Sequence, residues 1–308
     1  MITYILTGGT IGSSIGPDGV ARPDADVSGL IDKDAKIRIP YNILSENLDA
    51  KYLNLLISET AEAIEEGKSE GIIITHGSDT LQYSAAMLDI IFGGAGIPIV
   101  LVAANYVLAD PRSNGKVNLY FAQRFIEEKR GCGVFVCYRN PSEEVKIHMG
   151  RKLMPHEVFS DKIKSIGDQF YASYAYEEEM KTAVYRSKYN GKEEERYIAG
   201  FRFIDENSGS ILRIEPYPGM SYPEISDSVK AVLLGSYHSG TIAVNDELRV
   251  FLNKARQRGI DVYLCGIDRE GTEYESISIY KDLGIKPVFD VSPVYVYCML
   301  WLTGVFPA

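Results

Sequence analysis

Short apolar runs rich in β-branched residues alternate with helical patterns over the first 140 residues of the chain. The runs are Ile2–Leu6, Gly71–Thr75, Ile97–Val102 and Gly133–Cys137. The helical patterns are Asp49–Glu66, Leu81–Ile91 and Asn118–Lys129. Strands that alternate with helices in this way predict an α/β fold with a doubly wound, mostly parallel sheet.

The chain of 308 residues is long enough for two domains. Residues 168–210 are rich in Tyr, Glu and Lys and contain Asn190-Gly191, a typical hairpin turn. We interpret this stretch as a hairpin plus a linker. A smaller α/β unit follows, with strands at 231–234 and 261–264 and helices at 246–257, 274–283 and 294–302. The predicted organisation is a larger N-terminal α/β domain (1–185), a linker (186–210) and a C-terminal α/β domain (211–308).

Charge and apolar run length exclude several classes of partner. The net charge of −10 argues against binding to nucleic acid or to an anionic membrane surface. No apolar run approaches the ~20 residues that span a bilayer. The beginning of the chain lacks a signal-peptide pattern, and the four cysteines lack metal-ligand spacing. We therefore expect a cytoplasmic protein with reduced core cysteines and no structural metal.

Two glycine-hinged turns follow predicted strands, and each carries a hydroxyl. The first is Thr7-Gly8-Gly9-Thr10-Ile11-Gly12, and the second is Thr75-His76-Gly77-Ser78-Asp79-Thr80. Ligands of α/β sheets bind outside the carboxyl ends of the strands, where both turns would lie. A hydroxyl nucleophile needs activation, and its tetrahedral intermediate needs nearby donors, which backbone N–H groups beside Gly9 and Gly77 could supply. The two hydroxyls, of Thr10 and Ser78, therefore indicate acyl-transfer chemistry with a Thr nucleophile, in which Asp79 could orient a proton shuttle or bind a substrate ammonium group.

Each turn also has a purely structural interpretation. The first is compatible with a tight strand-to-helix turn, and the second with a helix N-cap. The first turn lacks both the ending of a P-loop and the glycine spacing of a dinucleotide fold, and the chain has no G-x-S-x-G elbow. We interpret His76 as a hydrogen-bonded histidine at a strand end, and we assign no chemistry to His148, His156 or His238.

The two turns, together with other segments in order, resemble the motifs of the L-asparaginase/glutaminase amidohydrolase family, closest to its cytoplasmic type I branch. The turns match T-G-G-T-I and H-G-T-D-T, with Ser78 in place of the second Thr. Further segments that resemble the family are Leu44–Leu48, Asn114–Tyr120, Leu212–Ile214, Tyr217–Met220 and Ser236–Gly240. The similarity covers nearly the whole chain.

The resemblance implies roles for individual residues. Thr10 would be the acylated nucleophile, and Ser78 and Asp79 the second hydroxyl and the carboxylate that holds the substrate α-amino group. Ser45 would bind the substrate α-carboxylate, with Glu46 beside the amino-acid head. Gly9 and Gly77 would line the substrate site. The family uses no metal or organic cofactor. It forms homodimers or homotetramers in which the second domain completes a neighbour's site.

The sequence departs from the family at two catalytic positions. Val20 stands where a loop Tyr is expected, although the loop itself resembles a mobile lid. Pro155 stands where the catalytic Lys is expected, five residues after Gly150. Either Lys152 or Arg151 could replace that amine, and Lys152 is our candidate catalytic residue. A shifted alignment of this stretch is the alternative.

Three hypotheses follow. The first is an amidohydrolase that releases ammonia from asparagine or a related side-chain amide, and we place it ahead because Thr10, Ser78 and Asp79 are all present. The second is a catalytically weak relative that binds an amino acid or amide as a sensor or partner subunit, which the loss of the family Tyr and Lys motivates. The third is the amidotransferase subunit that corrects mischarged tRNA. The acidic charge argues against this third hypothesis, as does that subunit's extra N-terminal domain, which we do not expect in this chain.

Overall fold

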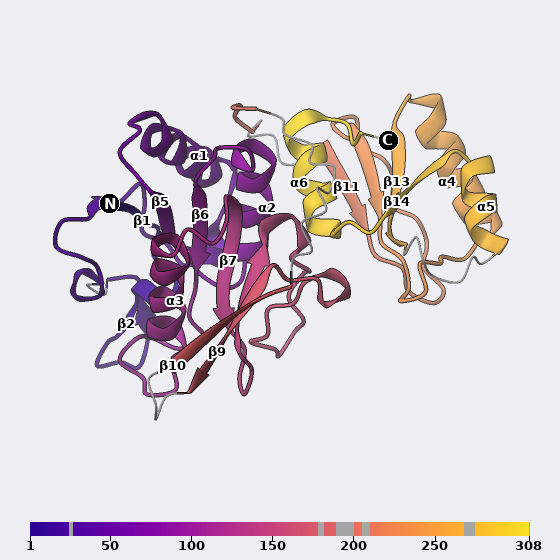
Figure 1. Ribbon diagram of the computed structural model, residues 1–308. Coiled ribbons are helices and arrows are strands. Elements are labelled where there is room, and N and C mark those ends of the chain that lie inside the picture. The colour runs from indigo at the N-terminus through magenta and orange to yellow at the C-terminus, as the bar shows by residue number, and fades with distance from the viewer. Residues whose placement is uncertain (25–26, 178–181, 189–199, 205–209, 268–274, 308) are drawn as a thin grey trace. The chain divides into compact units, whose positions relative to one another are not determined.

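A computed structural model gives the fold of the protein, and it separates the chain into two compact units, Met1–Ile204 and Asp205–Ala308 (Figure 1). The residues that the structure describes are 1–24, 27–177, 182–188, 200–204, 210–267 and 275–307. In these segments no helix is long and apolar enough to cross a membrane.

The first unit is built on an eight-stranded sheet with the order β10-β9-β8-β7-β6-β5-β1-β4. The neighbours β4, β1, β5, β6 and β7 are parallel, whereas β8, β9 and β10 add antiparallel strands at one edge. The strands are β1 (Ile2–Leu6), β4 (Lys36–Arg38), β5 (Gly71–Thr75), β6 (Pro98–Val102), β7 (Gly133–Arg139), β8 (Val145–Met149), β9 (Ala172–Glu177) and β10 (Thr182–Ser187).

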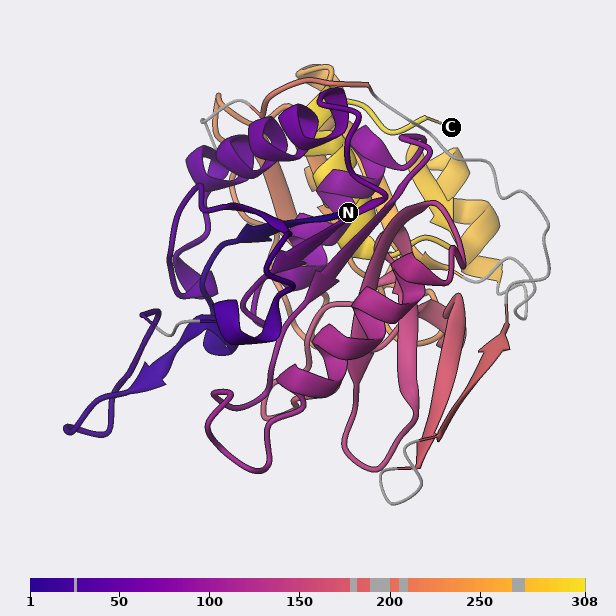
Figure 2. The ribbon, with the colours of Figure 1, turned by 60° about the vertical axis from the view of Figure 1, so that its left-hand side comes forward.

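Three helices cover this sheet, with α2 and α3 on opposite faces (Figure 2). They are α1 (Ala50–Glu65), α2 (Leu81–Phe92) and α3 (Gly115–Glu127). Asp49 caps α1 by accepting a hydrogen bond from the Tyr52 N–H at 3.0 Å. The central strands are buried on both faces, which is why they read as continuous apolar runs.

Short elements connect these parts. A two-stranded hairpin of β2 (Ser14–Ile15) and β3 (Ala21–Arg22) projects away from the sheet (Figure 2). The 3₁₀ helices are η1 (Thr10–Gly12), η2 (Ser28–Leu30), η3 (Ser45–Asn47), η4 (Gly150–Lys152) and η5 (Ile166–Asp168).

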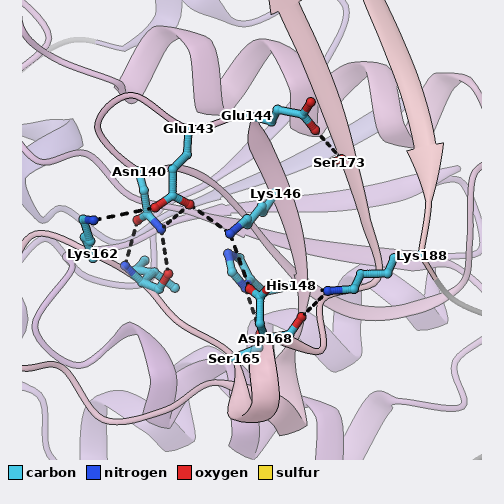
Figure 3. Close-up of polar contacts among 11 residues, drawn as sticks. Asn140, Glu143, Glu144, Lys146, His148, Lys162, Ser165, Asp168, Ser173 and Lys188 are labelled. Carbon is cyan, nitrogen blue, oxygen red and sulfur yellow. Dashed lines mark hydrogen bonds and ion pairs between the residues drawn. The ribbon is translucent and has the colours of Figure 1, made fainter.

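A polar network lies along β8 and the segment before β9 (Figure 3). The Lys146 Nζ atom lies 2.9 Å from a Glu143 carboxylate oxygen and 3.4 Å from an Asp168 carboxylate oxygen. His148 is buried, and its Nδ1 lies 2.8 Å from the Ser165 Oγ. The network fastens the antiparallel edge of the sheet and surrounds a histidine that has little access to water.

The second unit has a four-stranded parallel sheet with the order β11-β12-β13-β14. Its strands are β11 (Ile211–Ile214), β12 (Ala231–Leu234), β13 (Asp261–Ile267) and β14 (Ile285–Phe289). Its helices are α4 (Asp246–Gln257), α5 (Glu275–Asp282) and α6 (Pro293–Thr303). Alternate strand residues face two separate cores, so that Val232 packs in the core containing Phe251 of α4 and Leu233 in the core containing Leu300 of α6.

The predicted α/β class is confirmed: a large, mostly parallel sheet comes first and a smaller α/β unit follows. The predicted strands at Ile2–Leu6 and Gly71–Thr75 have the observed bounds. The β9–β10 hairpin lies inside the predicted hairpin stretch, whereas Asn190-Gly191 lies outside the described residues. The boundaries 1–185, 186–210 and 211–308 stay predictions. Cys132 is exposed, so the expectation that all four cysteines are in the core is wrong at that position.

Candidate active site at the carboxyl ends of β1 and β5

The first predicted turn is fixed to the end of the neighbouring strand. The Thr7 hydroxyl donates to the Thr75 carbonyl at 2.6 Å, which ties the end of β1 to the end of β5. Gly8 and Gly9 follow with φ of 94° and 70°. These angles lie in the left-handed region that glycine adopts readily, so the glycine pair allows the sharp exit from β1 into η1, which begins at Thr10.

The two predicted turns meet at Gly9 and Gly77. A Cβ atom placed on Gly9 would overlap the N and Cα atoms of Gly77 and would lie 2.7 Å from the His76 carbonyl carbon. A Cβ atom on Gly77 would lie 3.3 Å from the Gly9 Cα and 2.5 Å from the Ser45 Cβ. Three segments that are far apart in the sequence therefore converge, and glycine is required at both turns because no side chain fits between them.

Ser45 joins the second turn through two hydrogen bonds. The Ser45 hydroxyl donates to an Asp79 carboxylate oxygen at 3.3 Å, and the Thr80 hydroxyl donates to the Ser45 carbonyl at 2.9 Å. Ser45 is buried, whereas Asp79 and Glu46 are exposed. The carboxylate of Asp79 is therefore held by a buried hydroxyl while it remains open to a ligand. The bond from Thr80 was not anticipated, because residue spacing gives no signal for it.

Several backbone N–H groups at the turns have no acceptor within the described part of the chain, and two of them lie beside the candidate hydroxyls. These two are the N–H groups of Thr10 and Ser78, the residues that directly follow Gly9 and Gly77. The side chains of Thr10 and Ser78 are half-buried. Free N–H groups beside accessible hydroxyls are suited to stabilise negative charge on a bound oxygen.

His76 is hydrogen-bonded at both ring nitrogens, as the sequence interpretation expected. Its Nδ1 lies 2.8 Å from the Gly77 carbonyl oxygen, to which it can only donate. The Ser84 hydroxyl of α2 lies 2.8 Å from Nε2, which then accepts. Burial lowers the pKa of His76, so the ring is neutral. The Ser84 partner was missed, although a polar residue on an apolar helix was a visible signal for it.

Lys152 lies on η4, which follows β8. The strand β8 is antiparallel to β7, so the carboxyl end of β8 at Met149 pairs with Phe135 near the amino end of β7. The residues that follow β8 therefore begin at the amino-terminal part of β7 and not at the carboxyl ends of the parallel strands. The buried Lys152 ammonium donates to the Gln169 Oε1 at 2.5 Å. Arg151 pairs with Asp89 near the end of α2 at 3.6 Å. These placements do not link Lys152 to Thr10 or Ser78, and its catalytic role stays a prediction.

Val20 lies on the projecting β2–β3 hairpin and its side chain is 50% exposed. The hairpin is held by a bidentate Arg22–Asp18 pair, with one contact of 2.5 Å, and by the Ser14 hydroxyl, which donates to Asp24 at 2.6 Å. The chain thus places an exposed aliphatic side chain where the sequence resemblance leads one to expect a tyrosine.

The described residues contain no group of three or more His, Cys, Asp or Glu side chains that could hold a metal ion. The second unit has an open cavity of about 480 Å³ beside the loops that follow β11 and β12. Tyr217, Tyr222 and Tyr237 form part of its wall, and none of the predicted site residues lines it.

Comparison with known proteins identifies the family. The family model for the asparaginase N-terminal domain matches residues 1–166. A glutamyl-tRNA(Gln) amidotransferase subunit of Pyrococcus furiosus is 29% identical over 98% of this chain and 72% of its own length. The corresponding protein of Sulfurisphaera tokodaii is 26% identical over 95% of this chain and 68% of its own length.

Two solved structures share the fold. The thermostable L-asparaginase from Thermococcus kodakarensis superimposes with a TM-score of 0.74 at 23% identity, over 98% of this chain and 92% of that one. L-asparaginase I from Vibrio cholerae gives a TM-score of 0.72 at 22% identity over the same shares. The family model covers more than half of the chain and includes both glycine turns. The protein therefore belongs to the asparaginase family.

Proposed function

We propose that the protein is an amidohydrolase that releases ammonia from the side-chain amide of an amino acid or a related carboxamide. The Thr10 hydroxyl attacks the amide carbonyl carbon, the C–N bond breaks, and the nitrogen leaves as ammonia with the hydroxyl proton. Water then hydrolyses the threonyl ester, which releases the carboxylic acid and restores the hydroxyl. The reaction needs no oxidant, metal or organic cofactor.

The observation that carries this proposal is the contact between the Gly9 and Gly77 turns. It brings the residues that follow each glycine, Thr10 and Ser78, to the same end of the sheet. Their N–H groups, which have no acceptor among the described residues, are suited to bind the oxyanion of the tetrahedral intermediate. Asp79, oriented by Ser45, supplies a carboxylate for the substrate ammonium group, and Ser45 and its chain neighbour Glu46 supply the contacts for the rest of the amino-acid head.

The relatives give two starting points for the substrate. The solved neighbours are named L-asparaginases, and the curated relatives are named subunits of a glutamyl-tRNA(Gln) amidotransferase. The substrate panel therefore includes both asparagine and glutamine, together with peptide-linked asparagine and glutamine and simple carboxamides. We keep a role as an amidotransferase subunit as an alternative that the net charge of −10 disfavours, because tRNA is an anion.

The test is an ammonia-release assay over this panel, with Thr10→Ala as the control. We expect steady release from at least one amide by the wild type and loss of that release in Thr10→Ala, with an unchanged thermal unfolding curve. Thr10 is half-buried and makes no side-chain hydrogen bond within the described residues, so removing its hydroxyl leaves the fold intact. Release by Thr10→Ala at the wild-type rate would remove Thr10 from the mechanism.

A second candidate function is ligand binding without turnover. The 50% exposed Val20 at the position of the family's tyrosine favours it, as does the Lys152–Gln169 hydrogen bond, because that bond gives the predicted catalytic amine a partner outside the two turns. This function predicts thermal stabilisation by an amino acid or amide with no ammonia release. Steady ammonia production from that same ligand would eliminate it.

We also propose that the protein forms a homodimer or homotetramer and works in the cytoplasm, as the family resemblance implies. Light scattering coupled to size-exclusion chromatography tests the assembly. A monomer at micromolar concentration would contradict it.

A further inference from the structure

A buried histidine, His76, holds the peptide between Gly77 and Ser78 by a hydrogen bond to its carbonyl oxygen. His76 is 2% exposed, and its Nδ1–H donates to the carbonyl of the next residue, Gly77, at 2.8 Å. The main chain of His76 is fixed as well, because its N–H donates to the Val102 carbonyl of β6 at 2.8 Å. Both the ring and the backbone of His76 are therefore held by the end of the sheet.

The direction of the Ser78 N–H follows from this contact. The described peptide bonds are trans, and the C=O and N–H of a trans peptide point in opposite directions. Because the Gly77 carbonyl points to the buried His76 ring, the Ser78 N–H points away from that ring. This N–H has no acceptor among the described residues.

The Gly77 carbonyl decides which ring nitrogen of His76 carries the proton, and Ser84 bonds the other ring nitrogen. A carbonyl oxygen only accepts hydrogen bonds, so Nδ1 must carry a proton to bond Gly77. The Ser84 hydroxyl faces Nε2 at 2.8 Å and donates to it, which stabilises the neutral ring with the proton on Nδ1. The hydroxyl thereby supports the ring that holds the Gly77–Ser78 peptide, six residues earlier in the chain.

We propose that His76, locked by Ser84, is a positioning residue that aims the Ser78 N–H at the oxyanion of the reacting amide. This inference rests on the amidohydrolase function proposed above. His76 itself touches neither substrate nor reacting atoms. It acts by preventing rotation of the Gly77–Ser78 peptide, which glycine would otherwise permit, so that the donor is in place before the substrate binds.

Two variants and a matched control test the proposal. His76→Phe keeps an aromatic ring but has no donor for the Gly77 carbonyl, whereas His76→Asn keeps a side-chain N–H near the Nδ1 position. His148→Phe is the control, because His148 is also buried and also paired through one ring nitrogen with a serine, but lies in the β8 network. Each variant is assayed for kcat and KM with the amide that the wild type hydrolyses, and for thermal stability.

We expect His76→Phe to lower kcat about 10²-fold with KM changed less than about threefold, which is the size expected for one misdirected oxyanion donor. His76→Asn should recover a kcat within about tenfold of the wild type. His148→Phe should lose stability and keep its kcat. An unchanged kcat in His76→Phe would overturn the proposal, as would equal losses of kcat in His76→Phe and His148→Phe, because the loss would then come from general destabilisation.

The ring ¹⁵N spectrum of the folded protein supplies a readout that does not depend on activity. The chain has 4 histidines, and the variants assign the His76 signal. We expect a neutral ring protonated at Nδ1, because the Gly77 carbonyl accepts from that nitrogen. A wild type that releases no ammonia from any amide would refute the proposed function, whereas an Nε2-protonated His76 would refute this positioning role in an active or an inactive enzyme.

Discussion

Gly9 and Gly77 are in direct backbone contact, because a side chain on Gly77 would begin 3.3 Å from the Gly9 Cα and a side chain on Gly9 would overlap the backbone of Gly77. These two residues are far apart in the sequence and follow two adjacent parallel strands, β1 and β5. Their contact determines that Thr10 and Ser78 lie at one end of the sheet. Any change that separates the two turns therefore also separates the two hydroxyls.

Gly9→Ala should destabilise the fold and abolish ammonia release. Gly9 has a φ of 70°, and its new methyl group would collide with Gly77. Strain in this backbone region costs about 1–3 kcal/mol, and the two turns must separate to admit the methyl group. Gly12→Ala is the matched control, because no atom lies within 4 Å of its added Cβ. Urea unfolding of both variants measures the difference, and equal midpoints would disprove the close contact.

Asp79→Asn should weaken binding of a substrate that carries an ammonium group. The exposed carboxylate is held by Ser45 at 3.3 Å, and the amide keeps the shape but removes the charge. Hydrogen bonds to charged groups contribute about 1.5–3 kcal/mol, so KM should rise about 10–100-fold. Steady-state kinetics with the preferred amide checks this. A KM equal to that of the wild type would show that Asp79 does not contact the ammonium group.

Lys152→Met tests whether the only predicted catalytic amine takes part in proton transfer. Its ammonium bonds Gln169 at 2.5 Å, and Gln169 is exposed and can bond water instead, so the variant should lose only about 1 kcal/mol of stability. We expect ammonia release to fall less than tenfold, because the described bond of Lys152 directs it to Gln169. Complete loss of turnover in a folded Lys152→Met protein would instead assign Lys152 to the reaction.

The stability of the first unit should fall as the pH falls below about 6.5. Burial lowers the pKa of His148 to about 3, with the nearby Lys146 adding to the effect. The unfolded chain binds a proton at His148 near pH 6.5 and the folded chain does not, so acid favours unfolding. The carboxylates of Asp168 and Glu143 also lie near the ring, and they raise the pKa of His148 and so oppose the effect of burial.

The measurement is the free energy of unfolding between pH 7 and pH 5, for the wild type and for His148→Asn. The asparagine keeps a donor for Ser165 but cannot be protonated. The wild type should lose up to about 1.4 kcal/mol per pH unit more than the variant. Parallel pH profiles for the two proteins would show that His148 is accessible to protons in the folded state.

The central strands and the two turns could be predicted from the sequence because local signals determine them. Ile72 to Ile74 are buried on both faces of the sheet, so they appear as an uninterrupted apolar run. The glycines of the turns are visible because no other residue adopts their conformation at so little cost. Asp49 marks the beginning of α1 because its side chain caps that helix.

The parts of the fold and of the site that the sequence did not predict depend on contacts between residues far apart in the chain. The edge strand β4 has a half-exposed pattern over three residues, Lys36–Arg38, which gives little apolar signal. The hydrogen bond from Thr80 to Ser45 joins residues 35 positions apart, and the partner of Lys152 is Gln169, 17 positions away. No spacing rule relates such pairs, so sequence reasoning placed Ser45 and Asp79 through resemblance and gave no indication of the bond from Lys152 to Gln169.

Ammonia release by three forms of the enzyme tests the role of the two converging turns most directly. The wild type, Thr10→Ala and Thr10→Ser are compared over the same panel of asparagine, glutamine, their peptide-linked forms and simple carboxamides. We predict steady turnover of at least one amide by the wild type, partial turnover by Thr10→Ser, which keeps a hydroxyl, and none by Thr10→Ala. Turnover by Thr10→Ala at the wild-type rate, or no turnover of any amide by the wild type, would contradict a threonine nucleophile at this site.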